Sequence, residues 1–386
     1  MKRIAFAFLL MFASTVVKAQ EDQNIADLDF LYKAIQQTPS YKDQLKGDKS
    51  YVSLYESIKK DLKSTDDLLI YQQLLKLIYP LKDNHLGFYG KTDSPYKFNY
   101  LKPLINKDEV ENKYTNTSVN DIVGIYSSLS GKAKAVVYEQ SPKVFYLQNL
   151  NTNIVEAILT QMDSNTFEVI RFANPPFPYL LFRNVKFRNG RIDDLGYKKI
   201  DRPAFNDLVK GNENFEYRKL EDGIGYLRLS SFATFTPNVK KAKDFFELTK
   251  SQITEANLIV DIRNNGGGGY KVSQQFINFL KSYPGQVYIL QNGFSVSNAE
   301  QFVINLKGRK HITTLGETTK GTITYGSNYG KKLTLPSGRF VFGPTDMKGL
   351  AKELVYESKG ISPNIELDVF KSDWINQTVE YIKKRR

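Results

Sequence analysis

A serine between a predicted strand and a predicted helix is the residue best placed to do chemistry. Residues 287–290 are apolar, as in a buried strand, and residues 299–306 repeat apolar side chains at helical spacing. Ser297 stands at the expected N-terminus of that helix, where the helix dipole favours a negatively charged oxygen. An ordinary helix N-cap, with Glu300 completing a capping box, explains the same residue and is the commoner case. The position alone leaves both interpretations open.

Four consecutive glycines follow another predicted strand. The strand covers residues 258–262, and the glycines occupy residues 266–269. Glycine exposes backbone N–H groups and lets another group approach closely. The run lacks the Gly-Lys-Ser/Thr end of a P-loop, and Lys271 stands where a dinucleotide fingerprint needs its third glycine. An oxyanion hole and a tight structural turn remain as interpretations.

Six short motifs occur in one order along the chain. They are LKDNHLGF at 81–88, GIGYLRLSSF at 223–232, LIVDIRNNGGGG at 258–269, FSVSNAEQF at 294–302, GETTKG at 316–321 and YESKGISPNIEL at 356–367. Together they resemble the tail-specific (C-terminal processing) and tricorn-core serine peptidases, peptidase family S41. The resemblance spans residues 81–367, and it implies hydrolysis of peptides or unfolded proteins without a metal or another cofactor.

The resemblance implies Ser297 as the nucleophile and offers two general bases. The tricorn branch implies His85, with Glu357 as the carboxylate that orients it. The processing branch implies a lysine, which would be Lys320, but Thr322 occupies the matching place in an ungapped alignment. An imidazole also titrates near neutral pH without strong perturbation. We therefore favour Ser297, His85 and Glu357 as the catalytic residues, with Lys320 as the alternative base.

Two backbone amides are expected to form the oxyanion hole. They belong to Gly267 in the glycine run and to Asn298, the residue after the nucleophile. Gly266 or Gly268 could replace Gly267, because the sequence does not fix the geometry of the turn. We expect Asp261 and Arg263 to hold this turn by hydrogen bonds.

The periodicity of the chain predicts an α+β multidomain protein. We expect a helical bundle in residues 20–100, an antiparallel β domain, such as a small barrel, without a clear PDZ module in 101–210, and an α/β core in 211–386. The resemblance implies that this core is of the ClpP/crotonase type. A non-catalytic ligand-binding protein on the same fold is the alternative function.

The first 19 residues have the pattern of a cleavable signal peptide. A basic start precedes an apolar run, residues 4–17, and cleavage is expected after Ala19. The run is shorter than the ~20 residues of a membrane-spanning helix. We therefore expect export to the periplasm or the extracellular space and no stable membrane insertion.

The composition excludes several other classes. The formal net charge is +13, but the basic residues are scattered apart from a run at 383–386 that is expected to be a solvated tail, so we do not expect a nucleic-acid partner. The chain has no cysteine and only two histidines, which excludes a thiolate nucleophile and a histidine-rich metal cluster. The expected partner is a peptide or unfolded protein substrate, and the oligomeric state stays open.

Overall fold

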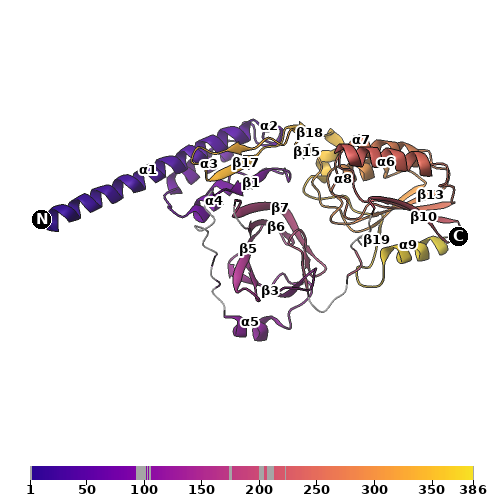
Figure 1. Cartoon of the computed structure of the whole chain (residues 1–386), viewed down its shortest axis with the longest axis horizontal. Helices are drawn as coiled ribbons and strands as arrows, with labels where there is room; N and C mark the ends of the chain where they lie inside the picture. Colours follow the sequence, from indigo (N-terminus) through magenta and orange to yellow (C-terminus); the bar gives the residue numbers. More distant parts are fainter. Residues whose placement is uncertain are drawn as a thin grey trace. The chain divides into compact units, whose positions relative to one another are not determined.

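The structure is a computed structural model that describes residues 2–92, 101, 103, 106–173, 176–199, 204–206, 213–221 and 223–385. The chain forms two compact units (Figure 1). Unit 1 comprises Met1–Lys199 and Tyr325–Lys348, and unit 2 comprises Ile200–Thr324 and Gly349–Arg386. The boundaries that the sequence predicts near residues 100 and 210 fall outside the described residues, so the three-domain division stays a prediction.

Unit 1 begins with helices that pack on a small sheet. The helices are α1 (Lys2–Gln36), α2 (Pro39–Gln44), α3 (Lys49–Asp61) and α4 (Asp67–Leu75). Their apolar faces share one core with β1 (Gly87–Gly90) and β17 (Phe340–Gly343), which pair antiparallel, and β16 (Leu333–Thr334) extends this edge. Within the described residues, no helix has the length and apolarity that crossing a membrane requires.

The rest of unit 1 is a closed antiparallel β-barrel. Its strands are β2 (Gly124–Ser128), β3 (Lys134–Ser141), β4 (Val144–Asn149), β5 (Ile154–Gln161), β6 (Thr166–Phe172), β7 (Tyr179–Arg188), β8 (Arg191–Ile192) and β9 (Tyr197–Lys199). Each strand pairs with the next one along the chain, and the pairing of the first strand, β2, with the last, β9, closes the ring (Figure 1). The short helix α5 (Lys107–Tyr114) packs on β2 and β3. Alternate residues fill the interior, among them Phe167 and Val169, while Ile170 and Phe172 face the helical core.

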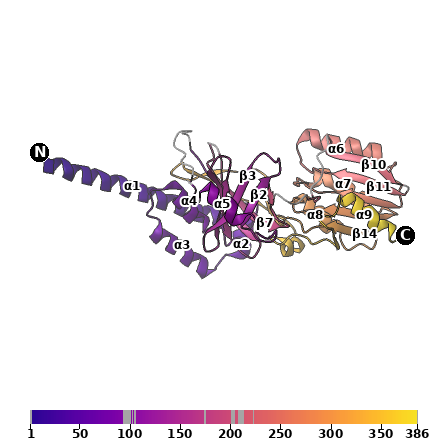
Figure 2. The same cartoon turned by 90° about the horizontal axis from the view of Figure 1, so that it is seen from below.

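Unit 2 is a three-layer α/β/α structure. Its sheet runs in the order β10 (Phe215–Glu221), β11 (Ile224–Leu229), β12 (Asn257–Asp261), β13 (Gln286–Gln291), β14 (Ile312–Gly316) and β19 (Ile365–Glu366), with all pairs parallel except β10–β11. One face is covered by α6 (Thr236–Thr249), α7 (Tyr270–Lys281) and α8 (Asn298–Leu306), and the other by α9 (Trp374–Lys383) (Figure 2). Parallel strands need such cover on both faces, because each buries apolar side chains on both sides.

The segment Tyr325–Lys348 is an insertion that leaves unit 2 and joins unit 1. It contributes β15 (Tyr325–Gly326), β16, β17 and β18 (Met347–Lys348), and the 3₁₀ helix η1 (Ala351–Tyr356) follows once the chain is back in unit 2. The backbone N–H of Gly349 donates to the carbonyl of Thr324, so the insertion begins and ends at one place in unit 2.

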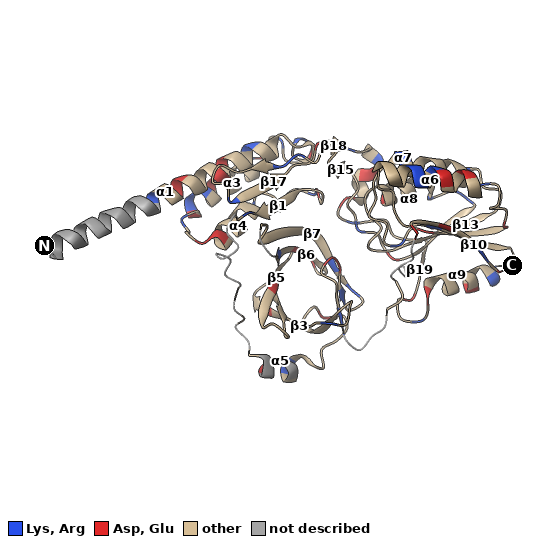
Figure 3. Ribbon diagram, in the orientation of Figure 1, with Lys and Arg blue, Asp and Glu red and all other residues tan. Residues whose placement is uncertain are grey.

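The architecture confirms the mixed α/β class and the antiparallel β region that the sequence predicts. Lysine and arginine residues are spread along the ribbon of both units and interspersed with acidic residues (Figure 3), in line with the scattered charge of the sequence. The β region closes into the small barrel that the sequence suggested. The pair of strands that closes it, β2 with β9, joins the two ends of the region and leaves no local signal in the sequence.

Candidate active site

Ser297 occupies a strained turn between β13 and α8 in unit 2. Its backbone has φ 57° and ψ −117°, a conformation that non-glycine residues rarely adopt. Such strain persists only where the surrounding structure imposes it, and it concentrates at functional sites. Serine nucleophiles of hydrolases stand on turns of this kind, which lift the hydroxyl out of the backbone path. The side chain is half-buried, so it is partly open to solvent.

The glycine turn lies directly against this serine. A Cβ on Gly267 would come within 2.9 Å of Ser297 Cβ and of the Asn298 amide nitrogen, and within 2.6 Å of the Val296 carbonyl oxygen. Gly267 also has φ 86°, which favours glycine. The absence of a side chain therefore lets the two segments meet.

The amide of Gly267, which we expected in the oxyanion hole, has a partner within its own turn. It donates to Asn265 Oδ1 at 2.9 Å. With the residues that the structure describes, the N–H groups of Gly266, Gly268 and Asn298 make no hydrogen bond. These three amides are the donors that a developing oxyanion could use without breaking an existing contact.

Buried amide side chains tie the glycine turn to the serine turn. Asn292 Oδ1 accepts from the backbone N–H of Asn264 and of Phe294, and the Val296 amide donates to the Asn265 carbonyl. Asn265 Nδ2 reaches back to the carbonyl of Leu229. The bonds from Asn264 to Asn292 and from Val296 to Asn265 join the two turns, so the position of Ser297 relative to the glycines is fixed by more than one contact.

Asp261 and Arg263 hold the start of the glycine turn, as the sequence suggested. The Arg263 guanidinium donates to both carboxylate oxygens of Asp261, and both side chains are fully buried. Burial lowers the pKa of Arg263 and the adjacent Asp261 carboxylate raises it, and the net shift is upward. The arginine therefore stays charged and serves as a structural counter-ion.

Glu300 is a fully buried carboxylate that joins the serine turn to the loop after β14. Oε2 accepts from the backbone N–H of Ser297 and of Thr322, each at 3.0 Å. Oε1 accepts from the Thr319 hydroxyl at 2.5 Å and from the Gly321 amide at 2.7 Å. Burial raises the pKa of this carboxyl, and the four donors partly offset the rise. Glu300 thus positions both Ser297 and the loop that carries Lys320.

The loop that carries Lys320 is also anchored by Glu357. Glu357 is buried, and its Oε2 accepts from the amides of Ile323 at 2.9 Å and Thr324 at 2.7 Å. The Lys320 amide donates to the Ser295 carbonyl at 3.3 Å, so its backbone lies beside the serine turn. The structure brings Ser297, Gly267, Asn298, Lys320 and Glu357 together within unit 2.

His85 belongs to unit 1, in the loop between α4 and β1. Its backbone N–H donates to Asp83 Oδ1 at 3.3 Å, and Asp83 Oδ2 accepts from the Thr345 hydroxyl at 2.6 Å. Burial raises the pKa of Asp83 despite these hydrogen bonds. The loop that presents His85 is therefore held by a buried carboxyl group.

Arg183 on β7 of the barrel also holds the loop that carries His85. It donates to the carbonyls of Leu81 and Asp83, each at 3.0 Å, and it forms a buried ion pair with Glu168. This bridge joins the barrel to the segment that carries His85.

Sequence reasoning missed the anchoring roles of Glu300, Asn265 and Asn292. Glu300 was visible only as a capping-box residue, and a capping box does not disclose three further donors from residues 319–322. The concentration of asparagine around residues 264–265 and 292 was the available signal. No group of three or more His, Cys, Asp or Glu side chains in the described part of the chain could hold a metal ion.

No family model matches the chain, and no curated protein matches it. Among solved structures, 52 chains match. A candidate peptidase from Parabacteroides merdae is 15% identical over 94% of this chain and 96% of its own, with a TM-score of 0.46. The photosystem II D1 C-terminal processing protease is 16% identical over 89% and 93%, with a TM-score of 0.40. A candidate S41 protease from Bacteroides fragilis is 10% identical over 92% and 97%, with a TM-score of 0.38. All three are described as peptidases or proteases.

Proposed function

We propose that the chain is an exported serine peptidase that cleaves peptides or unfolded proteins through an acyl-enzyme on Ser297. The observation that carries the proposal is the strained backbone of Ser297 at the start of α8, directly against a glycine that has no room for a Cβ. An ordinary N-cap serine does not need a positive φ, since N-caps adopt extended backbone conformations. Strain at this one position is explained by the need to present the hydroxyl.

The chemistry follows from the groups around that hydroxyl. Ser297 Oγ would attack the substrate carbonyl, and the charge on the resulting oxyanion would be stabilised by the Asn298 amide and by one amide of the turn at residues 266–268. The N-terminal end of the α8 dipole favours the same charge. Water would then hydrolyse the acyl-enzyme, so the reaction needs no group beyond the protein and water.

A serine hydroxyl also needs a general base, and we propose His85, oriented by Glu357. This assignment rests on the sequence motifs around both residues and on the ability of imidazole to accept a proton near neutral pH. Lys320 remains the alternative base, because its backbone lies beside the serine turn. A lysine in this role would have to lose its proton in a desolvated position.

Covalent labelling tests the nucleophile. We expect a fluorophosphonate reagent to label the wild-type protein and not the Ser297→Ala variant. Ser358→Ala is a matched control, because Ser358 is also half-buried and also has a positive φ, 63°. Labelling that persists in Ser297→Ala, or that is lost equally in both variants, would remove Ser297 as the nucleophile.

Two further variants separate the bases. With an unfolded protein as substrate, we expect His85→Ala to reduce kcat by about 10³-fold or more and Lys320→Ala to leave most of the activity. The reverse result would assign Lys320 as the general base. If neither variant nor the wild type turns over or is labelled while small molecules bind the barrel, the chain is a non-catalytic ligand-binding protein.

We also propose that residues 1–19 are removed on export to the periplasm or the extracellular space. The expected N-terminus of the exported protein is Gln20, which N-terminal sequencing of secreted material measures. An exported protein that retains the apolar run would show that this segment serves as an anchor.

A further inference from the structure

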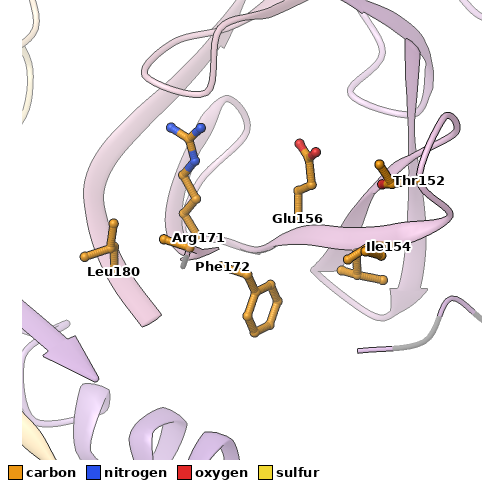
Figure 4. A pocket seen from close by; sticks show the side chains of 8 residues that line it. Thr152, Ile154, Glu156, Arg171, Phe172 and Leu180 are labelled. Carbon is orange, nitrogen blue, oxygen red and sulfur yellow. The ribbon is translucent and has the colours of Figure 1, made fainter. Parts of the chain in front are cut away.

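The β-barrel of unit 1 contains a pocket that the proposed peptidase chemistry does not use. The pocket has a volume of about 420 Å³ and lies where β5 begins and β6 ends (Figure 4). Pockets of a few hundred Å³ hold small molecules in proteins. Its lining combines apolar side chains with two charged ones, which are Arg171 and Glu156.

Arg171 is a charged residue at a position that faces the inside of the barrel. On β6, Phe167 and Val169 fill the apolar interior, and Arg171 is the next residue on that face. Phe172 points the opposite way, into the helical core (Figure 4). The alternation therefore directs the guanidinium toward the barrel mouth, where Arg171 is exposed to solvent.

The guanidinium of Arg171 has unused hydrogen-bonding capacity. It makes no hydrogen bond or ion pair with a described residue, and it lies 6.0 Å from the centroid of the Phe182 ring. A guanidinium has five N–H donors in a planar fork that matches a carboxylate. Elsewhere in the barrel, Arg183 and Arg188 use these donors in ion pairs with Glu168 and Asp193.

Glu156 is directed into the pocket by an irregularity in β5. Leu147 pairs with Ala157 and Gln148 with Val155, so Glu156 is an extra residue in the strand. As a result Val155 faces the helical core and Ala157 the barrel interior, although they are two residues apart. Such bulges re-aim a side chain and are common beside functional sites.

The carboxylate of Glu156 is fixed in place by neutral donors. Asn149 Nδ2 donates to Oε1 and the Tyr197 hydroxyl donates to Oε2, each at 2.6 Å. Two bonds leave acceptor capacity, because a carboxylate has about four acceptor sites. The Asn149–Glu156–Tyr197 arrangement holds the negative charge without neutralising it.

Arg171 and Glu156 therefore present opposite charges to one space. Arg171 pairs in register with Ala157, the residue next to Glu156, and both side chains point to the same side (Figure 4). They nevertheless form no ion pair with each other. Apolar walls, including Leu180 and Ile154, complete the pocket.

We propose that this pocket binds a zwitterion, namely an apolar amino acid or short peptide with free termini. The carboxylate of the ligand pairs with Arg171 and its ammonium group with Glu156, while apolar side chains lie against Leu180 and Ile154. The site consists of unit 1 residues and uses none of the residues around Ser297, so it would stand even if the chain were not a peptidase.

Calorimetric titration tests the proposal on the full chain carrying Ser297→Ala, which prevents turnover of the ligand. Three ligands are compared, which are L-leucyl-L-leucine, its N-acetyl derivative and its C-terminal amide. We expect the free dipeptide to bind about tenfold or more tightly than either blocked form, because each blocked form loses one charge-assisted pair.

Variants then assign the charges. Arg171→Gln should weaken the free dipeptide about tenfold and leave the amide unchanged. Glu156→Gln should make the pocket bind the free dipeptide no more tightly than its N-acetyl derivative. Lys132→Gln removes a positive charge from an exposed turn of the same barrel and is the control. It should leave the affinity for all three ligands unchanged. Circular dichroism verifies folding, which Arg171→Gln should not disturb because the Arg171 side chain makes no hydrogen bond to a described residue.

Three results would overturn the proposal. Equal affinity for the three ligands would exclude recognition of the termini, and N-acetyl binding as tight as that of the free dipeptide would indicate a simple carboxylate site. Absence of binding up to about 10 mM dipeptide, a concentration that detects even millimolar affinity, would exclude the site altogether.

Discussion

At the scale of single residues, the meeting of Gly267 with Ser297 is the tightest constraint in unit 2. Both residues have positive φ, and the space between them excludes a methyl group. Two atypical backbone positions in contact are costly for folding, at about 1–3 kcal/mol for the non-glycine one. Their persistence is consistent with a requirement to hold one hydroxyl beside a set of amides.

A pair of neighbouring glycines turns this constraint into a prediction. Gly267→Ala should slow fluorophosphonate labelling of Ser297 by about 100-fold, because the new methyl displaces Ser297 or Asn298 by the fraction of an ångström that reactivity requires. Gly266→Ala should label normally, since a Cβ there meets no atom within 4 Å. Equal rates for the two variants would show that the contact has no bearing on reactivity.

For this candidate site, the sequence could propose residues but not their backbone. The motifs singled out Ser297 and the glycine run from residue types alone. The positive φ of Ser297 was not predictable, because it depends on hydrogen bonds that form only in the folded chain, from the Val296 amide to the Asn265 carbonyl and from the Ser297 amide to Glu300. The bond from the Gly267 amide to Asn265 Oδ1 was not predicted either, although the two residues are close in sequence.

At the scale of elements, Glu300 couples α8 to the loop after β14, and this coupling should depend on pH. Burial raises the pKa of Glu300, so the folded state binds this proton more tightly than the unfolded chain. The contribution of Glu300 to stability is therefore complete at low pH and is lost as the pH rises through the raised pKa.

The Glu300→Gln variant, which cannot titrate, isolates this effect. Urea denaturation over a pH series should show that the free energy of unfolding of the wild type, minus that of the variant, falls as the pH rises. Fluorophosphonate should also label Ser297 more slowly in the variant than in the wild type. The amide NH₂ of the glutamine is a donor and cannot accept the hydrogen bond that the Ser297 N–H or the Thr319 hydroxyl donates to Glu300. A difference that grows with pH would mean that the hydrogen-bond donors outweigh burial.

The ion pair between Arg183 and Glu168 is a second link between elements. Arg183→Ala should lower the free energy of unfolding by about 3–5 kcal/mol, because it leaves Glu168 buried without its partner. Lys240→Ala, which removes an exposed pair with Asp244 on α6, should cost less than about 0.5 kcal/mol. Chemical denaturation measures both, and comparable losses would show that the buried bridge contributes no more than a surface pair.

The predictability of the elements differed between the units. The alternating pattern of unit 2 gave its strands and helices to within a few residues, since parallel strands are continuous apolar runs and helices keep one apolar face. The barrel strands were recognised as antiparallel and a small barrel was suggested, but the pair that closes it, β2 with β9, was not predicted. The bulge at Glu156 was also invisible, because a single extra residue leaves no periodicity of its own.

At the scale of the whole molecule, the insertion Tyr325–Lys348 predicts how fragments behave. Residues 200–386 alone should be poorly soluble, because Phe340 and Phe342, fully buried in unit 1, lose their surroundings. Replacing residues 325–348 by two glycines should restore solubility, since Thr324 and Gly349 are already hydrogen-bonded. Size-exclusion chromatography of the two fragments measures this, and similar elution of both as monomers would contradict it.

The same insertion makes the connection between the units more than a tether. A protease that cut only the covalent link after Lys199 would leave β17 of the downstream piece paired with β1 of the upstream piece, with its aromatic side chains still in the helical core. The two polypeptides would then copurify as one particle and separate only in denaturant. Scission of the backbone and loss of the assembly would be separate events for this protein.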